Sequence, residues 1–397
     1  MFIRYIFALL FLVVPCSASF AQKKEISQAK AYVKSGNNLA NAESMMYGLL
    51  KDSANRANER IWLILFDAVK KQYEQCNEQL YLKQPSDTSR LFLNARKMFT
   101  VLESLDSVET ANGKTPKYRK KHAEYLMALR PNIYNGGLFF SRKQDFQKAF
   151  DFFDTYIECP GKALFTGYDF STDKKLSKAA FMSMYCGYKQ NDAKRTLKFK
   201  DLAVRDSSNL DYALQYMAET YRNLHDTANF VNTLHEGFMT YPKSIYFFPR
   251  LYDYYYKAGD LKKSLQLCDD ALSVDNKNNV FLFAKSTVLL KLGRYDECIA
   301  ICNGLIAQND SLADAYLNVG LAYYNQAVKL DKNGLRSRKN RDAVNELYRK
   351  ALPFMQRYRE FAPKDTARWA LPLYTIYLNL NMGKEFDEID KIIKNAS

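Results

Sequence analysis

The stretch DAYLNVGLAYYNQA, residues 314–327, has the pattern of an amphipathic helix with a glycine in its middle. Its large apolar residues Tyr316, Val319 and Tyr323 recur at helical spacing, and Gly320 stands among them. Glycine in a helix interior costs about 1 kcal/mol relative to alanine, so another interaction must offset that loss. A second helix packed closely at this position would do so, because glycine presents no side chain there. The stretch therefore predicts one half of a helix hairpin.

A polar turn between two apolar helical segments recurs along the chain. The residue pairs at these turns are Gln144-Asp145, Asn191-Asp192, His225-Asp226, Gly259-Asp260 and Gly293-Arg294. Successive turns lie 47, 34, 34 and 34 residues apart. When the repeated segments are aligned on their turns, equivalent positions form a column. The column that contains Gly320 holds small residues in three earlier repeats, namely Gly137, Ala218 and Ser286. Met184 and Tyr252 interrupt this column, so we expect those two helix pairs to be spaced more widely.

This pattern resembles the tetratricopeptide repeat family, whose motif W-x2-L-G-x2-Y…A-x3-F…P recurs about every 34 residues. Tyr316, Val319, Gly320 and Tyr323 match the first half of that motif. The resemblance implies an all-α fold, a right-handed superhelical solenoid of stacked antiparallel helix hairpins with irregular terminal helices. Each hairpin of such an array buries its apolar face only against its neighbours.

The positions at which the 34-residue repeat is kept or lost divide the chain into four parts. Residues 1–21 are set apart as a signal peptide, and residues 22–128 keep no clean register and are interpreted as an N-terminal helical cap of degenerate repeats. A separate helical domain is the alternative for that segment. Residues 129–365 are expected to form the solenoid, with insertions near 158–175 and 328–346. Residues 366–397 are expected to form a C-terminal capping helix pair.

The N-terminal residues have the pattern of a secretory signal peptide. Arg4 supplies a positive charge, an apolar run follows from Ile6 to Val14, and Ser19-Phe20-Ala21 offers a cleavage site. We predict cleavage after Ala21, export to the periplasm or cell envelope, and no transmembrane segment in the mature chain. A lipid on Cys16 is an alternative that Pro15 disfavours. Periplasmic, surface-attached and secreted forms of the mature protein all remain open.

The net charge and the sequence motifs limit the partners and reactions that can be expected of this chain. Lys and Arg outnumber Asp and Glu by 58 to 43, which gives a net charge of +15 and favours acidic partners or an anionic envelope surface. Nucleic acid is disfavoured as a partner because the chain is expected to be exported. The three histidines are His122, His225 and His235, and no nucleotide-binding, zinc-protease or nucleophile-elbow motif occurs. We therefore predict no enzyme activity, no catalytic residues, no cofactor and no metal.

Six cysteines remain after cleavage: Cys76, Cys159, Cys186, Cys268, Cys298 and Cys302. Cys298 and Cys302 are four residues apart, which suits half a metal site, but both occupy core columns of the repeat. Buried cysteine behaves as a small hydrophobe, so we favour a place in the core for both. Cys159 with Cys186 is a candidate disulfide between neighbouring helices.

Basic residues and tyrosines recur in two adjacent columns near the end of each first helix. The resemblance implies that these columns face a concave groove and meet a ligand there. The predicted partner-binding residues are Arg142, Tyr188, Lys189, Arg222, Asn223, Tyr256, Lys257, Lys291, Tyr324 and Asn325. The alternative is structural, because cations in a helix's last turn favour its dipole and tyrosines often pack with only the hydroxyl exposed.

A second basic feature lies in the later insertion. Cations gather around Asn333-Gly334, and we predict a basic loop formed by Lys332, Arg336, Arg338, Lys339 and Arg341. Such a loop suits an anionic surface, and a merely solvated loop is the alternative.

Taken together, these features favour a non-catalytic exported scaffold of the bacterial cell envelope. We expect it to bind an acidic protein or peptide in a concave groove. One alternative is an outer-surface glycan-binding or uptake accessory protein, in which Tyr254 and Tyr256 stack on sugar rings. An assembly factor for envelope complexes differs from the first interpretation only in its partner. Partner identity and oligomeric state stay open.

Overall fold

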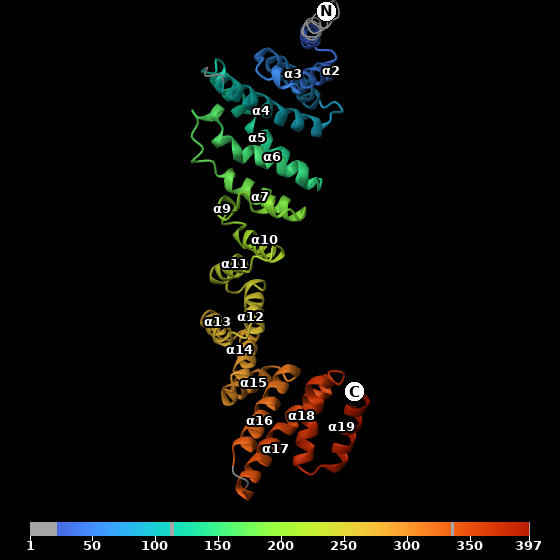
Figure 1. Cartoon of the computed structure of the whole chain (residues 1–397), viewed down its shortest axis with the longest axis vertical. Helices are drawn as coiled ribbons and strands as arrows, with labels where there is room; N and C mark the ends of the chain where they lie inside the picture. The colour runs from blue at the N-terminus through green and yellow to red at the C-terminus, as the bar shows by residue number, and fades with distance from the viewer. Residues whose placement is uncertain (1–21, 112–114, 335–336, 397) are drawn as a thin grey trace, which may run out of the picture. The chain divides into compact units, whose positions relative to one another are not determined.

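The computed structural model describes residues 22–111, 115–334 and 337–396 (Figure 1). Within these ranges every regular element is an α-helix or a short 3-10 turn. The predicted all-α class, built from consecutive packed helices, is confirmed. No helix of this described part is both long and apolar enough to cross a membrane. The predicted signal peptide, residues 1–21, lies outside the described residues.

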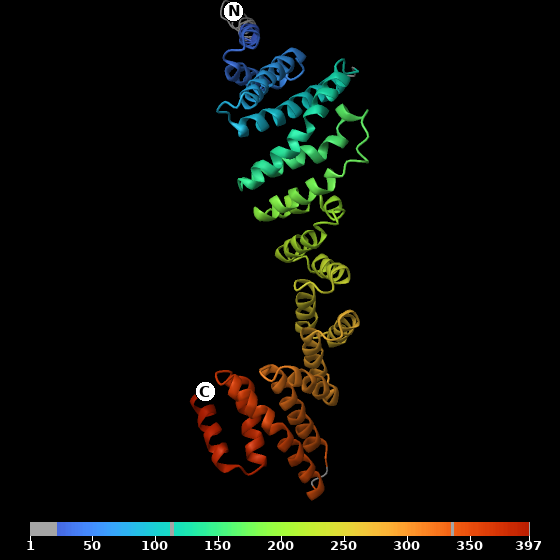
Figure 2. The same cartoon turned by 180° about the vertical axis from the view of Figure 1, so that it is seen from behind.

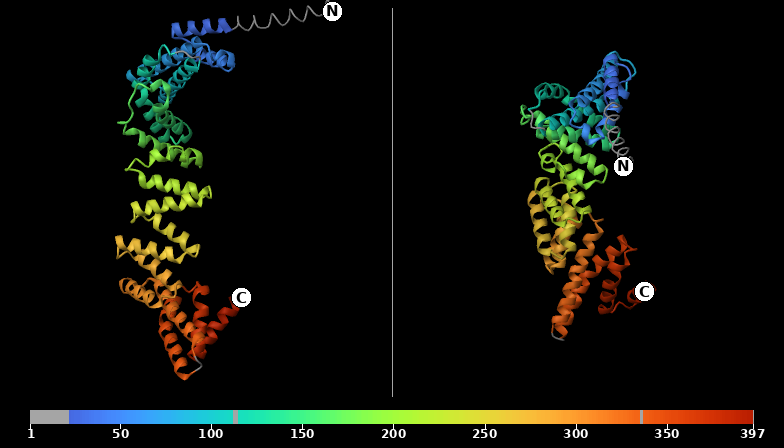
Figure 3. Two further views of the ribbon diagram at one scale, coloured as in Figure 1. Left: turned by 60° about the vertical axis from the view of Figure 1, so that its left-hand side comes forward. Right: turned by 45° about the horizontal axis from the view of Figure 1, so that its top comes forward.

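The chain divides into two compact units, residues 1–230 and 231–397. Unit 1 contains helices that follow one another in chain order, each beside the next, as the left view of Figure 3 shows. A helix over residues 22–35 comes first. It is followed by α2 (Leu39–Leu50), α3 (Glu59–Tyr81), α4 (Thr88–Ala111), α5 (Arg119–Arg142), α6 (Phe146–Glu158), α7 (Lys175–Lys189), α8 (Ala193–Leu197), α9 (Lys200–Ala203) and α10 (Leu210–Asn223).

Helix α11 (Thr227–Thr240) contains the boundary between the units. In its described residues, unit 2 continues with eight further helices, of which α16 and α17 are the longest, and Figure 2 shows them from behind. They are α12 (Phe247–Lys257), α13 (Leu261–Val274), α14 (Asn279–Lys291), α15 (Tyr295–Gln308), α16 (Ala313–Asn333), α17 (Arg338–Phe361), α18 (Thr366–Asn379) and α19 (Gly383–Ala396). The last two, α18 and α19, occupy the segment where a C-terminal capping helix pair is predicted.

The repeated turn pairs have one physical explanation. The first residue of each pair has a left-handed φ, which ends the preceding helix: Gln144 (59°), Asn191 (53°), His225 (57°), Gly259 (74°) and Gly293 (74°). The second residue caps the next helix when it is aspartate. Asp145, Asp192, Asp226 and Asp260 each accept a hydrogen bond from the backbone N–H three residues later, at 3.0–3.1 Å.

The close approach predicted at Gly320 is present. A Cβ built on Gly320 would lie 2.5 Å from Met355 Sδ of α17, so any larger residue would displace that side chain. Met184 occupies the equivalent position in α7, where a small residue would be needed for a close approach. In this pair, α7 approaches α8 at a different residue, Gly187. A Cβ on Gly187 would lie 2.4 Å from the backbone nitrogen of Thr196, and only glycine fits there. The register therefore shifts by three residues in this pair.

The first insertion, residues 158–175, packs onto unit 1. It contains two 3-10 turns, η2 (Cys159–Gly161) and η3 (Ala163–Phe165). The Phe165 side chain is buried, with its ring centroid 6.1 Å from that of Phe99. The Asp173 carboxylate accepts hydrogen bonds from Arg130 at 2.6 Å and from the Tyr156 hydroxyl at 2.8 Å. These contacts hold the middle and the C-terminal end of the inserted segment against unit 1.

Two predicted boundaries differ from the structure. Residues 128 and 129, where the cap was expected to meet the repeats, both lie inside α5. The second insertion is mostly helical, because α16 continues to Asn333 and α17 begins at Arg338. Residues added to both arms of a hairpin lengthen it when their sequence favours helix, and this segment has no proline and one glycine, Gly334.

All six cysteines of the described residues are free and buried. The candidate disulfide between Cys159 and Cys186 is therefore wrong. Cys159 Sγ instead lies 3.2 Å from the carbonyl oxygen of Thr155 in the preceding turn. Cys298 and Cys302 belong to the apolar core of unit 2, as the repeat columns predicted.

Candidate functional site

Aromatic side chains of α7 and α10 gather on one face of unit 1. Phe181, Tyr185 and Tyr188 are spaced by four and three residues along α7, and Tyr212 and Tyr216 lie one turn apart on α10. Tyr216 is at the centre of this aromatic cluster. Its ring centroid lies 4.5 Å from Tyr188, 6.0 Å from Tyr185, 6.1 Å from Phe181 and 6.4 Å from Tyr212.

The outer edge of the aromatic cluster is open to solvent. Tyr212 is 54% exposed, and Tyr188 and Tyr216 are half-buried. Burial raises the pKa of Tyr216, and the neighbouring tyrosines add to that rise. The Tyr216 hydroxyl therefore stays protonated at neutral pH. Half-exposed tyrosines of this kind offer both apolar ring surface and hydrogen-bonding hydroxyls to a partner.

A cavity of about 170 Å³ adjoins the aromatic cluster where α7 and α10 end. Tyr188 belongs to both the cluster and the cavity wall. The cavity is lined by Tyr188, Asn191, Ala193, Thr196, Thr220, Asn223 and Leu224. Leu224 is 51% exposed, so an apolar side chain stands at the rim beside two carboxamides. The site therefore combines a ring, an aliphatic edge and amide groups able to donate and accept hydrogen bonds.

The turn between α7 and α8 fixes this wall. Asn191 has a left-handed φ of 53°, which ends α7, and its N–H donates to the carbonyl oxygen of Tyr188 at 3.0 Å. The Asp192 side chain then accepts from the N–H of Arg195 at 3.0 Å and begins α8. Because Gly187 allows α8 to approach closely, the cavity lies directly beside the helix pair.

Two of the predicted residues in unit 1, Tyr188 and Asn223, meet at this cavity. A third, Lys189, is exposed at the end of α7, and its Nζ lies 5.5 Å from the ring centroid of Tyr185. The ammonium group of Lys189 is thus placed beside the aromatic cluster, where it favours a partner with negative charge.

The other two predicted residues of unit 1 contribute less to this site. Arg222 is exposed on α10 and forms an ion pair with Glu219 of the same helix. That ion pair offsets the positive charge that Arg222 was expected to present, together with the other basic residues of its column, to a ligand. Arg142 is the last residue of α5, exposed, and is not among the residues that line the cavity.

In unit 2, three predicted residues also lie at helix ends. Tyr256 and Lys257 end α12, and Lys291 ends α14. The Tyr256 ring stacks on that of Tyr252, with centroids 5.5 Å apart and planes at 17°. Lys257 Nζ lies 2.8 Å from Asp253 Oδ2 on the same helix, which again offsets a cation. Lys291 is exposed.

Tyr324 and Asn325 do not lie near a helix end. They occupy the middle of α16, because that helix continues to Asn333. Tyr324 is half-buried, and its hydroxyl lies 3.5 Å from Thr375 Oγ1 of α18. The position expected for these two residues is wrong, since the lengthened hairpin replaced the turn that the register placed there.

The predicted basic loop is also corrected. Lys332 lies in the last turn of α16, and Arg338, Lys339 and Arg341 lie in the first turns of α17. Arg336 lies outside the described residues. The four described cations are exposed, so they remain candidates for contact with an anionic surface, presented by helix ends rather than by a loop.

Four rings of the aromatic cluster were not predicted from the sequence: Phe181, Tyr185, Tyr212 and Tyr216. The repeat columns drew attention to the last turn of each helix, whereas these rings lie earlier. Their spacing of four residues on α10, and of three between Tyr185 and Tyr188 on α7, was the available signal. Only the packing of α7 against α10 shows that the two stripes face each other.

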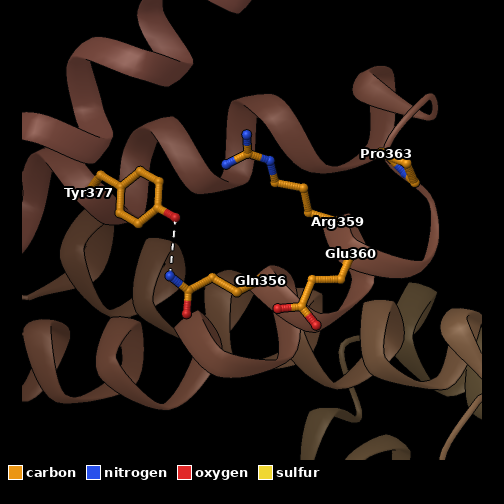
Figure 4. A pocket seen from close by; sticks show the side chains of 5 residues that line it. All are labelled: Gln356, Arg359, Glu360, Pro363 and Tyr377. Carbon is orange, nitrogen blue, oxygen red and sulfur yellow. Dashed lines mark hydrogen bonds between the residues drawn. The ribbon is translucent and has the colours of Figure 1, made fainter.

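A larger cavity, of about 380 Å³, lies in unit 2 between α17 and α18. Figure 4 shows Gln356, Arg359 and Glu360 of α17 on one side and Tyr377 of α18 on the other. Gln356 Nε2 donates to the Tyr377 hydroxyl at 3.3 Å, and Arg359 forms an ion pair with Glu388. These polar groups already have partners, Glu360 with Arg357, and no residue of the predicted site lines the cavity.

No cluster of three or more His, Cys, Asp or Glu side chains suited to a metal occurs among the described residues. His225 occupies an inter-helix turn with a left-handed φ. His122 packs against the rings of Phe66 and Tyr118, and neither histidine is placed beside a nucleophile and an acid as in a hydrolytic triad.

No protein-family model matches the chain. Among curated proteins, the chain is 29% identical over 97 residues to Hsp70-Hsp90 organizing protein 1 of Arabidopsis thaliana, which covers 24% of this chain and 17% of that protein. The Hsp70-Hsp90 organizing protein of Triticum aestivum matches with the same identity over 97 residues, 16% of its length. The chain thus spans less than a fifth of the curated relatives it matches.

Solved structures with a similar helical fold include tetratricopeptide repeat proteins. One is the C-terminal part of such a protein from Cytophaga hutchinsonii, 10% identical, covering 65% of this chain and 93% of that one, with a TM-score of 0.42. Another is YrrB, a repeat protein with an unusual peptide-binding site, 15% identical, covering 64% and 96%, with a TM-score of 0.24. At these identities and TM-scores the likeness concerns the helical fold alone.

Proposed function

We propose that the chain is a non-catalytic binding scaffold that holds an extended protein or peptide segment against the aromatic cluster and the adjoining cavity of unit 1. The observation that carries this proposal is the placement of Tyr188, which belongs to both features. A segment lying across them would contact the exposed Tyr212 ring first and the amide of Asn223 last. Aromatic surface beside carboxamides suits a peptide, whose side chains are apolar in part and whose backbone needs hydrogen bonds.

The expected partner is acidic. Lys189 is exposed beside the cluster, and the net charge of the whole chain is +15. Opposite charge raises the rate of encounter and selects among partners more than it adds to affinity. The proposal includes export to the cell envelope, on the strength of the signal-peptide pattern at residues 1–21.

A peptide display library offered to the mature chain tests this function. We expect selected peptides to carry net negative charge. Replacing Tyr188 and Tyr212 with alanine should weaken their binding about tenfold or more, because buried tyrosine anchors dominate such interfaces. The matched control is Tyr81→Ala, since Tyr81 is a tyrosine of the same unit that is 86% exposed at the end of α3. Binding should be unchanged in that variant.

Charge is tested separately. Lys189→Glu should weaken the selected acidic peptides several-fold, and Lys51→Glu, an exposed lysine elsewhere in unit 1, should not. Equal losses in both variants would show that only net charge matters and would overturn the assignment of the site. Retained binding in the Tyr188→Ala, Tyr212→Ala double variant would do the same.

The glycan alternative has less support. Sugar stacking needs a free ring face, and the Tyr256 ring is half-buried with one side against Tyr252. Polysaccharide binding on a glycan array that disappears in Tyr256→Ala would favour this alternative over the peptide scaffold.

A further inference from the structure

A second cavity in unit 1, of about 240 Å³, lies between α3 and α5 and has no part in the proposed peptide site. Phe66 of α3 packs against Tyr125 of α5 edge to face, with ring centroids 5.7 Å apart. His122 lies 5.9 Å from Phe66 and 5.6 Å from Tyr118, measured between ring centroids. Four flat rings therefore form one wall of this small space.

Charged groups stand among the remaining lining residues. Lys70 of α3 has its Nζ 4.9 Å from the ring centroid of Tyr125 and 3.7 Å from Glu74 Oε1, one turn further along the same helix. Lys121 of α5 is exposed, and Asp67 of α3 supplies one carboxylate. Two lysines against one aspartate leave the lining with an excess of one positive charge.

The shifted pKa values of two groups in the wall, His122 and Tyr125, leave this balance unchanged. Burial lowers the pKa of His122, and the neighbouring Lys121 lowers it further, so the imidazole is neutral at pH 7. Burial raises the pKa of Tyr125 to about 12, so its hydroxyl is also neutral. Outside the lining, Lys71 and Glu74 of α3 act on Asp67 with opposite sign, so they leave the excess in place.

We propose that this cavity binds a small monoanionic aromatic compound, one ring bearing a single carboxylate. The ring would pack against the aromatic wall, where ring pairs are favourable in tilted and offset arrangements. The carboxylate would lie toward Lys121 at the rim, where the site carries its excess positive charge. A cavity of this volume holds one ring and a short side arm, so the ligand is a small metabolite or the C-terminal aromatic residue of a peptide.

Ligand-observed NMR titration of the mature chain tests the proposal with 4-hydroxyphenylacetate as the probe. Saturable binding is expected with a Kd of roughly millimolar or tighter, given the few atoms buried. The uncharged analogue 4-hydroxyphenylacetamide should bind at least about threefold more weakly, and acetate should show no saturation. A short peptide ending in a free tyrosine carboxylate, compared with its amidated form, distinguishes the peptide source from the free metabolite.

Two variants assign the binding to this cavity. Lys121→Gln should weaken the acid and leave the amide unchanged, whereas Lys120→Gln, an exposed neighbour outside the lining, should affect neither. Tyr118→Leu keeps an apolar side chain and should weaken both ligands. Equal affinities for acid and amide, no effect of Lys121→Gln on the acid, or no saturable binding would each overturn the proposal. These results leave the peptide site unaffected, because it uses other helices.

Discussion

At the scale of single residues, the carboxyl group of Glu103 is the clearest case of a buried charge with an incomplete environment. Its Oε1 atom is buried in α4 and has no hydrogen-bond partner. Burial raises the pKa of Glu103 to about 7, while Lys162 opposes the rise and Glu158 adds to it. The folded state thus binds a proton that the unfolded state, with its ordinary pKa of 4.5, releases.

This difference predicts a pH dependence of stability. Between pH 4.5 and 7 the folded chain binds more protons at Glu103, so the free energy of unfolding falls as pH rises through that window. Glu103→Gln mimics the protonated form and should raise the free energy of unfolding at pH 8 by about 1–3 kcal/mol. At pH 4 the same variant should change it little.

Urea unfolding at pH 4, 6 and 8 measures the effect, with Glu124→Gln, an exposed position on α5, as the control. A gain that is as large at pH 4 as at pH 8 would mean that Gln improves packing, and that ionisation of Glu103 has no part in the result.

At the scale of secondary structure, the start of α17 has an unfavourable charge arrangement. Arg338, Lys339 and Arg341 occupy the first turns, where the helix dipole favours negative charge. Each cation there costs about 0.3–1 kcal/mol at low salt. Ser337 caps the helix by accepting from the N–H of Asn340 at 3.1 Å, so the helix forms in spite of these charges. Such a costly arrangement is consistent with a role in binding an anionic surface.

Charge reversal separates stability from binding at this helix. The Lys339→Glu, Arg341→Glu double variant should unfold at the same or a slightly higher temperature, because the new charges suit the dipole. Its binding to vesicles of anionic phospholipid should fall about tenfold or more, since each basic residue near such a surface contributes about 1 kcal/mol. Vesicle co-sedimentation measures this. Lys262→Glu with Lys277→Glu makes the same change of net charge at exposed sites elsewhere in unit 2, and equal losses there would refute a specific role for α17.

The helices and turns show what sequence alone can predict. A left-handed residue followed by a capping aspartate is a local signal, and it placed the turns at Asn191-Asp192 and Gly259-Asp260 correctly. The path after Ala327 was predicted as a basic loop and is mostly helical, because a polar charged segment with one glycine suits either a loop or two longer helices. Cys159 and Cys186 show the same limit. Whether two cysteines form a disulfide depends on the distance between them in space, which their separation in the sequence does not give.

Only part of the candidate site could be predicted from the sequence, for a related reason. Tyr188 and Asn223 lie in the columns that the repeat register picks out. Tyr212 and Tyr216 join them only because α10 packs against α7, and a contact between helices about 30 residues apart is a property of the packed pair. The two ion pairs that offset Arg222 and Lys257 were also missed, although partners at i−3 and i−4 are a recognisable local pattern.

At the scale of the whole molecule, the two compact units raise the question of whether the chain unfolds as one block. Stability in a repeat array depends on contacts between neighbouring helix pairs. Helix α11 contains the boundary between Phe230 and Val231. It contributes Phe230 to the apolar core of unit 1, and Gly237 and Phe238 pack against Phe247 and Phe248 of α12 in unit 2. One helix therefore supplies packing to both units.

The two tryptophans of the chain allow a direct test, because Trp62 lies in unit 1 and Trp369 in unit 2. Trp369→Phe leaves Trp62 as the reporter, and Trp62→Phe leaves Trp369. Leu65 is fully buried in α3, so Leu65→Ala should destabilise unit 1 by about 2–5 kcal/mol. We expect the urea midpoint reported by Trp62 to fall by the corresponding amount, while the midpoint reported by Trp369 moves much less. Identical shifts at both tryptophans would show that α11 transmits the loss and that the two units unfold as a single cooperative structure.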